Sequence, residues 1–260
     1  MKARAKTARL APKKASTRLK RAHHSALGTP HSALDWLPHL LQTTDSIFPT
    51  GSYAHSFGLE EMANLGLVHN GETLGDFLQR QLIPALEHLE LPYLRFAHDA
   101  VLKGDLSKLL ALDSELSAIK VTMELRQASI NIGCQRLSML LEIAPDEMFS
   151  KFQTEITAGR AKGHHLIIFG LQTAVQKLPL DAALGAFYYG ALSSVTSASM
   201  KVIRIGQVAC HKVLADALQR AMDVIARSKR VKREDAGWFN PLLDIVSARH
   251  ETAYTRLFIS

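Results

Sequence analysis

The sequence predicts an all-α protein, a single-domain helical bundle of about eight to ten helices. After residue 31, apolar side chains recur at the three- and four-residue spacing of helices. No segment shows the alternation of apolar and polar residues that marks a half-buried strand. The chain has 260 residues and is 47% apolar, so it can bury a substantial core.

The first residues differ from the rest of the chain in charge. Residues 1–24 contain nine lysines and arginines and no acid, which leaves 22 basic against 24 acidic side chains afterwards. No apolar run of signal-peptide length occurs there. We therefore predict a disordered basic arm at 1–31 and one helical domain at 32–260. Besides a solvated extension, such an arm is compatible with binding to nucleic acid or an anionic surface, or with a transit-peptide-like role.

The domain is predicted to open with a short helix. Ser32 and Asp35 have the spacing of a capping box, and the helix should end near Gln42. Its apolar stripe would consist of Leu34, Leu37 and Leu41. A second helix should begin at Leu59 and end near Gly66 or at 70–71.

Residues 45–61, which read DSIFPTGSYAHSFGLEE, connect these two helices and are dense in turn-forming residues. Asp45 or Ser46 can cap or close a turn, Pro49 fixes its own φ and extends Phe48, and Gly51 permits a backbone angle that a side chain disfavours. Aromatic and hydroxyl side chains are thereby held on a stiff loop that enters a helix. The segment is either an ordinary helix connection with two core aromatic residues or a binding surface.

The next helical stretch is predicted to start at Thr73, with Asp76 completing its first turn. Pro84 should kink this helix, and Pro92 should begin a separate segment at 93–102. The stripe at helical spacing consists of Leu74, Phe77, Leu78, Leu82, Ala85 and Leu89.

Asp105 is predicted to cap a further helix, and the helical pattern should break near 117–120. The core-facing residues would be Leu106, Leu109, Leu110, Leu116 and Ile119 before the break, and Met123, Ile130, Cys134, Leu137 and Leu141 after it. The polar face of the second helix would carry Glu124, Arg126, Gln127, Ser129, Gly133 and Arg136. A glycine inside a helix, Gly133, predicts close approach of a neighbouring element.

Pro145 and the acids that follow it should begin another helix, and 164–176 reads as an apolar helix. The run at 180–226 is too long for one helix in a compact domain, and a break is predicted at 204–207. Within it, residues 182–200 carry no formal charge but are rich in serine, alanine and glycine. We interpret them as a helix buried in protein and not as a membrane span.

Two features of the second half bear on assembly. Gly190 and Ser194 have the spacing at which small residues let another backbone pack close, either inside the domain or between subunits. From Pro241, the chain ends in an amphipathic, aromatic tail. Such a tail is either docked on its own domain or kept free to dock on a partner.

Nothing in the sequence predicts a catalytic, metal or cofactor site. Twelve histidines are scattered, and Tyr254 stands where the HExxH zinc pattern needs its second histidine. Phosphate-binding loops and the GxSxG elbow are also missing from the sequence. Cys134 and Cys210 lie far apart, as expected of reduced thiols in a cytoplasmic protein. We therefore predict a non-enzymatic, cytoplasmic protein without a cofactor.

Four separated blocks resemble the urease accessory protein F family, UreF. They are DSIFPTGSYAHSFGLE at 45–60, ELRQASINIGCQRL at 124–137, the region 188–207 ending VIRIGQ, and PLLDIVSARHETAYTRLFIS at 241–260. The first and last blocks are specific, and the four occur in order over nearly the whole domain. One departure is Ile205-Gly206-Gln207 after Arg204, where the family often has Pro-Leu-Gly-Gln.

The resemblance implies an all-α, dimeric, non-enzymatic chaperone of nickel-urease maturation. In that family the dimer bridges two copies of an accessory protein called UreD or UreH. It also recruits the accessory GTPase UreG and regulates the nucleotide turnover that is coupled to nickel delivery to apo-urease. Neither a membrane nor a nucleic acid is then expected as a partner. The alternative is a helical nucleic-acid-binding protein that uses the basic arm.

The resemblance also implies three groups of partner-binding residues. The GTPase-facing or dimer surface would comprise Phe48, Pro49, Gly51, Tyr53, Ser56, Gly58 and Glu60. The helical region implicated in assembly would contribute Tyr188, Arg204 and Gln207. The tail that orders on UreD/UreH would contribute Asp244, His250, Glu251, Arg256, Leu257 and Phe258. Within the loop, Phe48 is expected to be structural and Tyr53 exposed.

Overall fold

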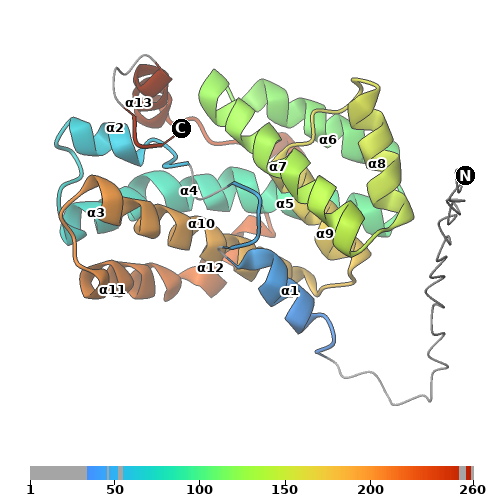
Figure 1. The fold of residues 1–260 in the computed structure, drawn as a ribbon, viewed down its shortest axis with the longest axis horizontal. Helices are drawn as coiled ribbons and strands as arrows, with labels where there is room; N and C mark the ends of the chain where they lie inside the picture. Colours follow the sequence, from blue (N-terminus) through green and yellow to red (C-terminus); the bar gives the residue numbers. More distant parts are fainter. Residues whose placement is uncertain (1–33, 46, 52–54, 252–255, 259–260) are drawn as a thin grey trace, which may run out of the picture. The chain divides into compact units, whose positions relative to one another are not determined.

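The computed structural model describes residues 34–45, 47–51, 55–251 and 256–258, and of Glu251 the backbone only. Every regular element within these ranges is helical, so the all-α prediction is confirmed (Figure 1). None of the helices found there is long and apolar enough to cross a membrane. The predicted arm at 1–31 lies outside the described residues.

The helices are named in chain order. Their bounds are α1 Leu37–Thr44, α2 Leu59–Asn64, α3 Gly71–Phe77, η2 Leu78–Leu82, α4 Ile83–Ala85, η3 Leu86–Glu90, α5 Leu91–Leu102, α6 Leu106–Ile119, α7 Met123–Ile143, α8 Glu147–Thr157, α9 His165–Val175, α10 Leu180–Val202, α11 Gln207–Leu218, α12 Ala221–Ser228, η4 Arg233–Asp235 and α13 Pro241–Glu251. The turns η2 and η3 are π-helical, and η4 is a 3-10 turn.

Local capping signals place two helix starts as predicted. The carboxylate of Asp105 accepts from the backbone N–H of Lys108 at 2.9 Å and caps α6. The carboxylate of Asp146 accepts from the backbone N–H of Met148 at 2.7 Å and caps α8. In both cases a short side chain satisfies an N–H group that the first helical turn leaves unpaired.

The stretch 71–102 is a continuous helical path, not the kinked helix and separate segment that we predicted. The π-helical turns η2 and η3 precede Pro84 and Pro92. A wider turn can accommodate a proline that lacks an N–H group, which accounts for the helix continuing through both positions. The start also differs, because Asn70 is the N-cap and accepts from the Thr73 N–H at 2.9 Å.

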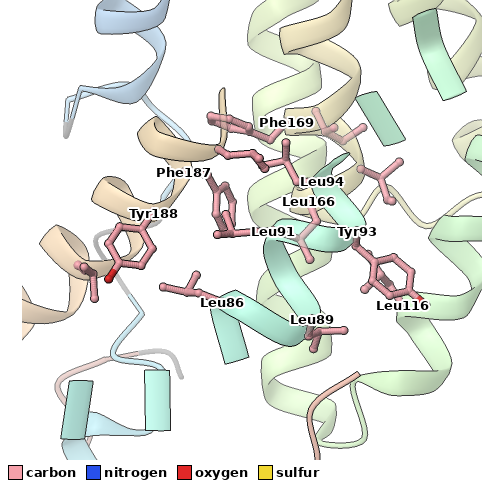
Figure 2. Close-up of a cluster of buried hydrophobic side chains, with 14 of the residues drawn as sticks. Leu86, Leu89, Leu91, Tyr93, Leu94, Leu116, Leu166, Phe169, Phe187 and Tyr188 are labelled. Carbon is pink, nitrogen blue, oxygen red and sulfur yellow. The ribbon is translucent and has the colours of Figure 1, made fainter. Parts of the chain in front are cut away.

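Helix α5 lies at the centre of the packing and contacts α6, α9, α10 and α12. Figure 2 shows Leu91 and Leu94 of α5 in the buried cluster with Leu166 of α9 and Phe187 of α10. Full burial of a leucine side chain contributes about 1.5–3 kcal/mol. The predicted leucine stripes therefore meet in one core around α5.

A buried polar cluster joins α6, α7 and the start of α9. The carboxylate of Asp113 accepts from the backbone N–H of His164 at 2.8 Å and from that of Gly163 at 3.2 Å. It thereby fixes the turn that leads into α9 and places negative charge near the N-terminal end of that helix. The His164 ring lies 2.8 Å from Ser117 Oγ and 3.1 Å from Ser129 Oγ. Burial lowers the pKa of His164 to about 4, so the ring is neutral at pH 7.

The buried face of α7 was predicted only in part: Leu137 is buried as expected, whereas Met123 is exposed. Ser129, Gly133 and Arg136, which we assigned to a polar face, are buried. The reason is that α9 brings polar groups to this face, among them Gln172, whose Oε1 accepts from Arg136 Nη1 at 2.7 Å. The close approach predicted at Gly133 is confirmed, because a Cβ there would lie 2.0 Å from the carbonyl oxygen of Gly163.

Helix α1 also buries a different face from the predicted one. Leu40 and Thr43 are buried, whereas Leu34 and Leu41 are exposed. The buried face is set by contact with α10 and by a hydrogen bond in which Thr43 Oγ1 accepts from Gln172 Nε2 at 2.8 Å. The spacing of apolar residues within the eight residues of α1 cannot indicate a partner as distant in the sequence as Gln172.

The predicted break in the long helical run is confirmed. Helix α10 ends at Val202 and α11 begins at Gln207. In α10, a Cβ added at Gly190 would meet no heavy atom within 4 Å. No other helix in the described part of the chain therefore packs closely against Gly190. Packing inside the domain, one of the two interpretations of the Gly190–Ser194 spacing, is not seen there.

Candidate partner-binding surface

The loop between α1 and α2 is anchored by its aromatic residue and by its last glycine. Phe48 is buried, and its ring centroid lies 5.2 Å from the guanidinium carbon of Arg136. Gly58, the N-cap of α2, has a φ of +84°, and a Cβ there would lie 2.7 Å from Leu243 Cδ1 of α13. Glycine is thus required at residue 58 both for the left-handed backbone and for contact with the C-terminal helix.

The other predicted loop residues differ in burial. Pro49 is exposed, Gly51 is half-buried with a φ of +76°, and Ser56 is buried with its Oγ 3.4 Å from the Glu60 backbone N. Tyr53 lies outside the described residues. The structural role expected of Phe48 agrees with its burial, while the exposure expected of Tyr53 stays a prediction.

Glu60, in the first turn of α2, holds the end of the chain. The residue is 4% exposed, and its carboxylate accepts from the backbone N–H groups of Leu257 at 2.7 Å and Phe258 at 3.0 Å. The same carboxylate lies 3.1 Å from Nε2 of His250, which is 1% exposed. Glu60 therefore joins the predicted loop surface to the predicted tail surface.

A second carboxylate completes this network. Glu124 Oε2 of α7 lies 3.0 Å from His250 Nδ1, and Glu124 Oε1 accepts from Arg256 Nη1 at 3.1 Å. Both ring nitrogens of His250 thus face carboxylate oxygens. We call Glu60, Glu124, His250 and Arg256 the tail latch.

The latched region also presents apolar side chains to solvent. Phe258 packs inside, with Lys201 Nζ 5.2 Å from its ring centroid. Asp244 is half-buried and accepts from Thr122 Oγ1 at 3.2 Å. The large apolar side chains left exposed here are Trp238, Phe239, Leu242, Ile245 and Leu257. We call these five residues the C-terminal apolar strip.

A groove of about 1220 Å³ runs beside the loop and α10. Its α10 wall includes Tyr189, Gly190, Ser194 and Ser197, and the loop contributes Thr50 and Phe57. Tyr189 is 48% exposed. The described ranges contain no group of three or more histidine, cysteine, aspartate and glutamate side chains placed to hold a metal ion.

The helical group of predicted residues is divided between core and surface. Tyr188 is fully buried, and its hydroxyl donates to the carbonyl oxygen of Ala217 at 3.0 Å. Arg204 and Gln207 are exposed at the break between α10 and α11. Figure 2 shows Tyr188 among the core side chains. The assigned partner-binding roles of all three residues stay predictions.

Replacing Tyr188 by phenylalanine should lower the free energy of unfolding by about 0.5–1.5 kcal/mol, because a buried hydrogen bond is lost while the Ala217 carbonyl still accepts from the backbone N–H of Arg220. Urea denaturation followed by circular dichroism measures this loss. The matched control is Tyr189→Phe on the exposed side of α10, which should change stability by less than about 0.5 kcal/mol. A Tyr188→Phe protein of unchanged stability would contradict the buried hydrogen bond.

Sequence reasoning left two contributors to this surface unassigned. Glu124 was placed on a polar helix face, and Arg136 was not connected with Phe48. Both belong to the block at 124–137 that resembles the UreF family, and that resemblance was the signal in the sequence that could have drawn attention to them. Glu251 ends α13, but its side chain lies outside the described residues.

The fold and the site define an all-α protein whose distinctive features are a packed loop, a C-terminal segment latched to it and an open groove. The chain belongs to the UreF family, because a model of that family, described as UreF, matches residues 68–218. The urease accessory protein UreF of Paenarthrobacter aurescens (strain TC1) is 33% identical over 224 residues, 85% of this chain and 96% of that protein. The protein of the same name from Arthrobacter sp. (strain FB24) is 31% identical over 221 residues, with the same shares covered. A third, from Haemophilus influenzae (strain ATCC 51907 / DSM 11121 / KW20 / Rd), is 30% identical over 232 residues, 89% of this chain and 99% of that protein.

Proposed function

We propose that this chain acts in urease maturation as a non-catalytic scaffold that regulates the GTPase UreG together with UreD/UreH, so that nickel is inserted into apo-urease. Membership of the UreF family and the name of its relatives, urease accessory protein UreF, support the role in urease maturation. The scaffold would work in the cytoplasm and hold no cofactor of its own. Its chemistry would be recognition, for which exposed apolar anchors on a rigid support suffice.

The observation that carries the proposal is the C-terminal apolar strip. Phe239 is 80% exposed, Leu257 70% and Ile245 59%, although the latch holds Leu257 and Phe258 firmly by their backbone. We infer that these side chains form one apolar patch, and exposed apolar patches mark protein contacts. We assign this strip to UreD/UreH.

Two other surfaces would serve the remaining contacts. Ile47 is 86% exposed and Pro49 is exposed beside it, on the loop that we assign to UreG. Gly190 and Ser194 on the open face of α10 would admit the backbone of a second copy, which supports a homodimer through this helix.

The double substitution Phe239→Ala with Ile245→Ala should weaken binding to UreD/UreH by about a hundredfold, because truncating anchor residues commonly costs 2 kcal/mol or more. The affinity is measured by titration of the purified proteins. Val208→Ala with Met222→Ala is the matched control, since both side chains are exposed apolar residues of α11 and α12. That control should bind normally.

Truncation of the chain after Asn240 tests the same surface by removing residues 241–260 altogether. The truncated protein should fail to retain UreD/UreH in a pull-down, provided that its helical circular dichroism is preserved. Full retention by the truncated protein, or equal weakening by the two double variants, would refute the assignment of the tail. Size-exclusion chromatography with UreG, nickel and a GTP analogue then tests the complete assembly.

A further inference from the structure

Two buried nitrogen atoms on the wall of the groove have no hydrogen-bond partner in the part of the chain that the structure describes. They are Nε of Arg136 in α7 and Nε2 of His165 in α9. The two side chains share Phe169, whose ring centroid lies 4.9 Å from the Arg136 guanidinium carbon and 6.0 Å from the His165 ring centroid. Nε–H of Arg136 is a buried donor without an acceptor, and Nε2 of His165 is a second one in the tautomer that carries its proton there.

Arg136 also lacks a countercharge among the described residues. It is 5% exposed, and its contacts are the rings of Phe48 and Phe169 and the amide oxygen of Gln172, none of which carries a full negative charge. Arg95, on another helix, shows the usual arrangement, with Asp99 3.9 Å away. Burying a cation without an anion is unfavourable, and burial lowers the pKa of Arg136 to about 9.

His165 adds a neutral group beside this charge. Burial and the nearby charge of Arg136 both lower the pKa of His165 well below its ordinary value, so the ring is uncharged at neutral pH. In the tautomer protonated at Nε2, it donates one hydrogen bond. A guanidinium and an imidazole N–H are complementary to an oxygen-rich anion, which accepts from both.

We propose that Arg136 and His165 form a binding site for a small oxyanion, a carboxylate or a phosphate, at the bottom of the groove. The anion would supply the countercharge that Arg136 lacks, and its oxygens would accept from Arg136 and from His165 Nε2. It would lie close to Phe48, and so brace the loop at 47–51 from beneath. This site would bind its anion whether or not the chain docks on UreG or UreD/UreH.

The test is a titration of the full chain, labelled with ¹⁵N-arginine, with sodium phosphate or sodium acetate at constant pH and ionic strength, using sodium chloride as the reference. The Arg136 Nε–H resonance, assigned by its loss in Arg136→Lys, should shift saturably with phosphate, acetate or both. At tenfold excess over the dissociation constant, Tm should rise by about 3–6 °C relative to chloride. Saturation by phosphate alone or by acetate alone identifies the class of anion.

Variants separate this site from the general effect of salts. Arg136→Gln should abolish the anion-dependent rise in Tm, and His165→Phe should weaken anion binding about tenfold or more, as expected for the loss of a hydrogen bond to a charged group. Arg95→Lys is the control and should respond like the unaltered protein. If Arg136→Gln does not fold, the proposal is tested by the resonance titration of the unaltered protein and by the anion affinity of His165→Phe. A resonance that does not move, or that moves equally with chloride, overturns the proposal.

Discussion

Glu60→Gln should release the C-terminal segment from the body of the protein. Glutamine keeps the volume of the side chain but replaces one acceptor oxygen with an NH₂ donor. In either orientation of the amide, that donor faces a backbone N–H group. It faces that of Leu257 from the Oε1 position, or that of Phe258, together with the His250 ring, from the Oε2 position. Losing the charged acceptor of a buried hydrogen bond costs about 1.5–3 kcal/mol. Hydrogen exchange at the Leu257 and Phe258 amides should therefore accelerate by up to about a hundredfold.

The control for this experiment lies at the next position. Glu61 pairs with Arg249, whose side chain is 61% exposed, so Glu61→Gln removes a pair that water already screens. Its effect on the same two amides should be small, because exposed ion pairs contribute about 0–1 kcal/mol. Unchanged exchange at Leu257 and Phe258 in Glu60→Gln would mean that the carboxylate does not hold the tail.

The tail latch shows why part of the site could not be predicted from the sequence. The resemblance to the UreF family predicted partner-binding roles for both Glu60 and His250, but it assigned Glu60 to the loop surface and His250 to the tail. They lie 190 positions apart, and their contact depends on α13 packing against α2. No spacing rule reaches across that distance, because such rules describe neighbours on one element.

Helix α7 illustrates the same limit within the fold. The close approach at Gly133 follows from local chemistry and was predictable, and the break before the helix was predicted near 117–120 and lies at 120–122. Which face the helix buries was not predictable throughout, because Ser129 is buried against His164, the N-cap of α9, and Arg136 against Gln172 of α9. Polar residues are usually exposed, and the exception depends on hydrogen-bond partners elsewhere in the chain.

The two prolines in the stretch 71–102 show a third kind of error. Pro84 and Pro92 predict a kink or a boundary on local grounds, yet the helix continues through both by means of π-helical turns. The leucines on either side of these turns are buried in one core, among them Leu78, Leu86 and Leu91. The free energy of that burial outweighs the local cost of the irregular turns.

Gly133→Ala should destabilise the whole domain. The added Cβ would lie 2.0 Å from the Gly163 carbonyl oxygen and 2.7 Å from the His165 backbone N, so no side-chain rotation can relieve the clash. The α7–α9 contact would have to open, and the turn that Asp113 holds by hydrogen bonds to Gly163 and His164 would shift with it. We expect a loss of about 3 kcal/mol or more in the free energy of unfolding.

Thermal unfolding followed by circular dichroism measures this loss, and a fall in Tm of about 6–12 °C corresponds to 3 kcal/mol in a domain of this size. Gly75→Ala is the matched control, since Gly75 lies inside α3 and an added Cβ there meets no heavy atom within 4 Å. Alanine is the better helix former, so this control should be neutral or gain up to about 1 kcal/mol. If Gly133→Ala behaves like Gly75→Ala, the two helices do not approach as closely as the structure places them, and the burial of Arg136 and Ser129 would have to be reconsidered with that contact.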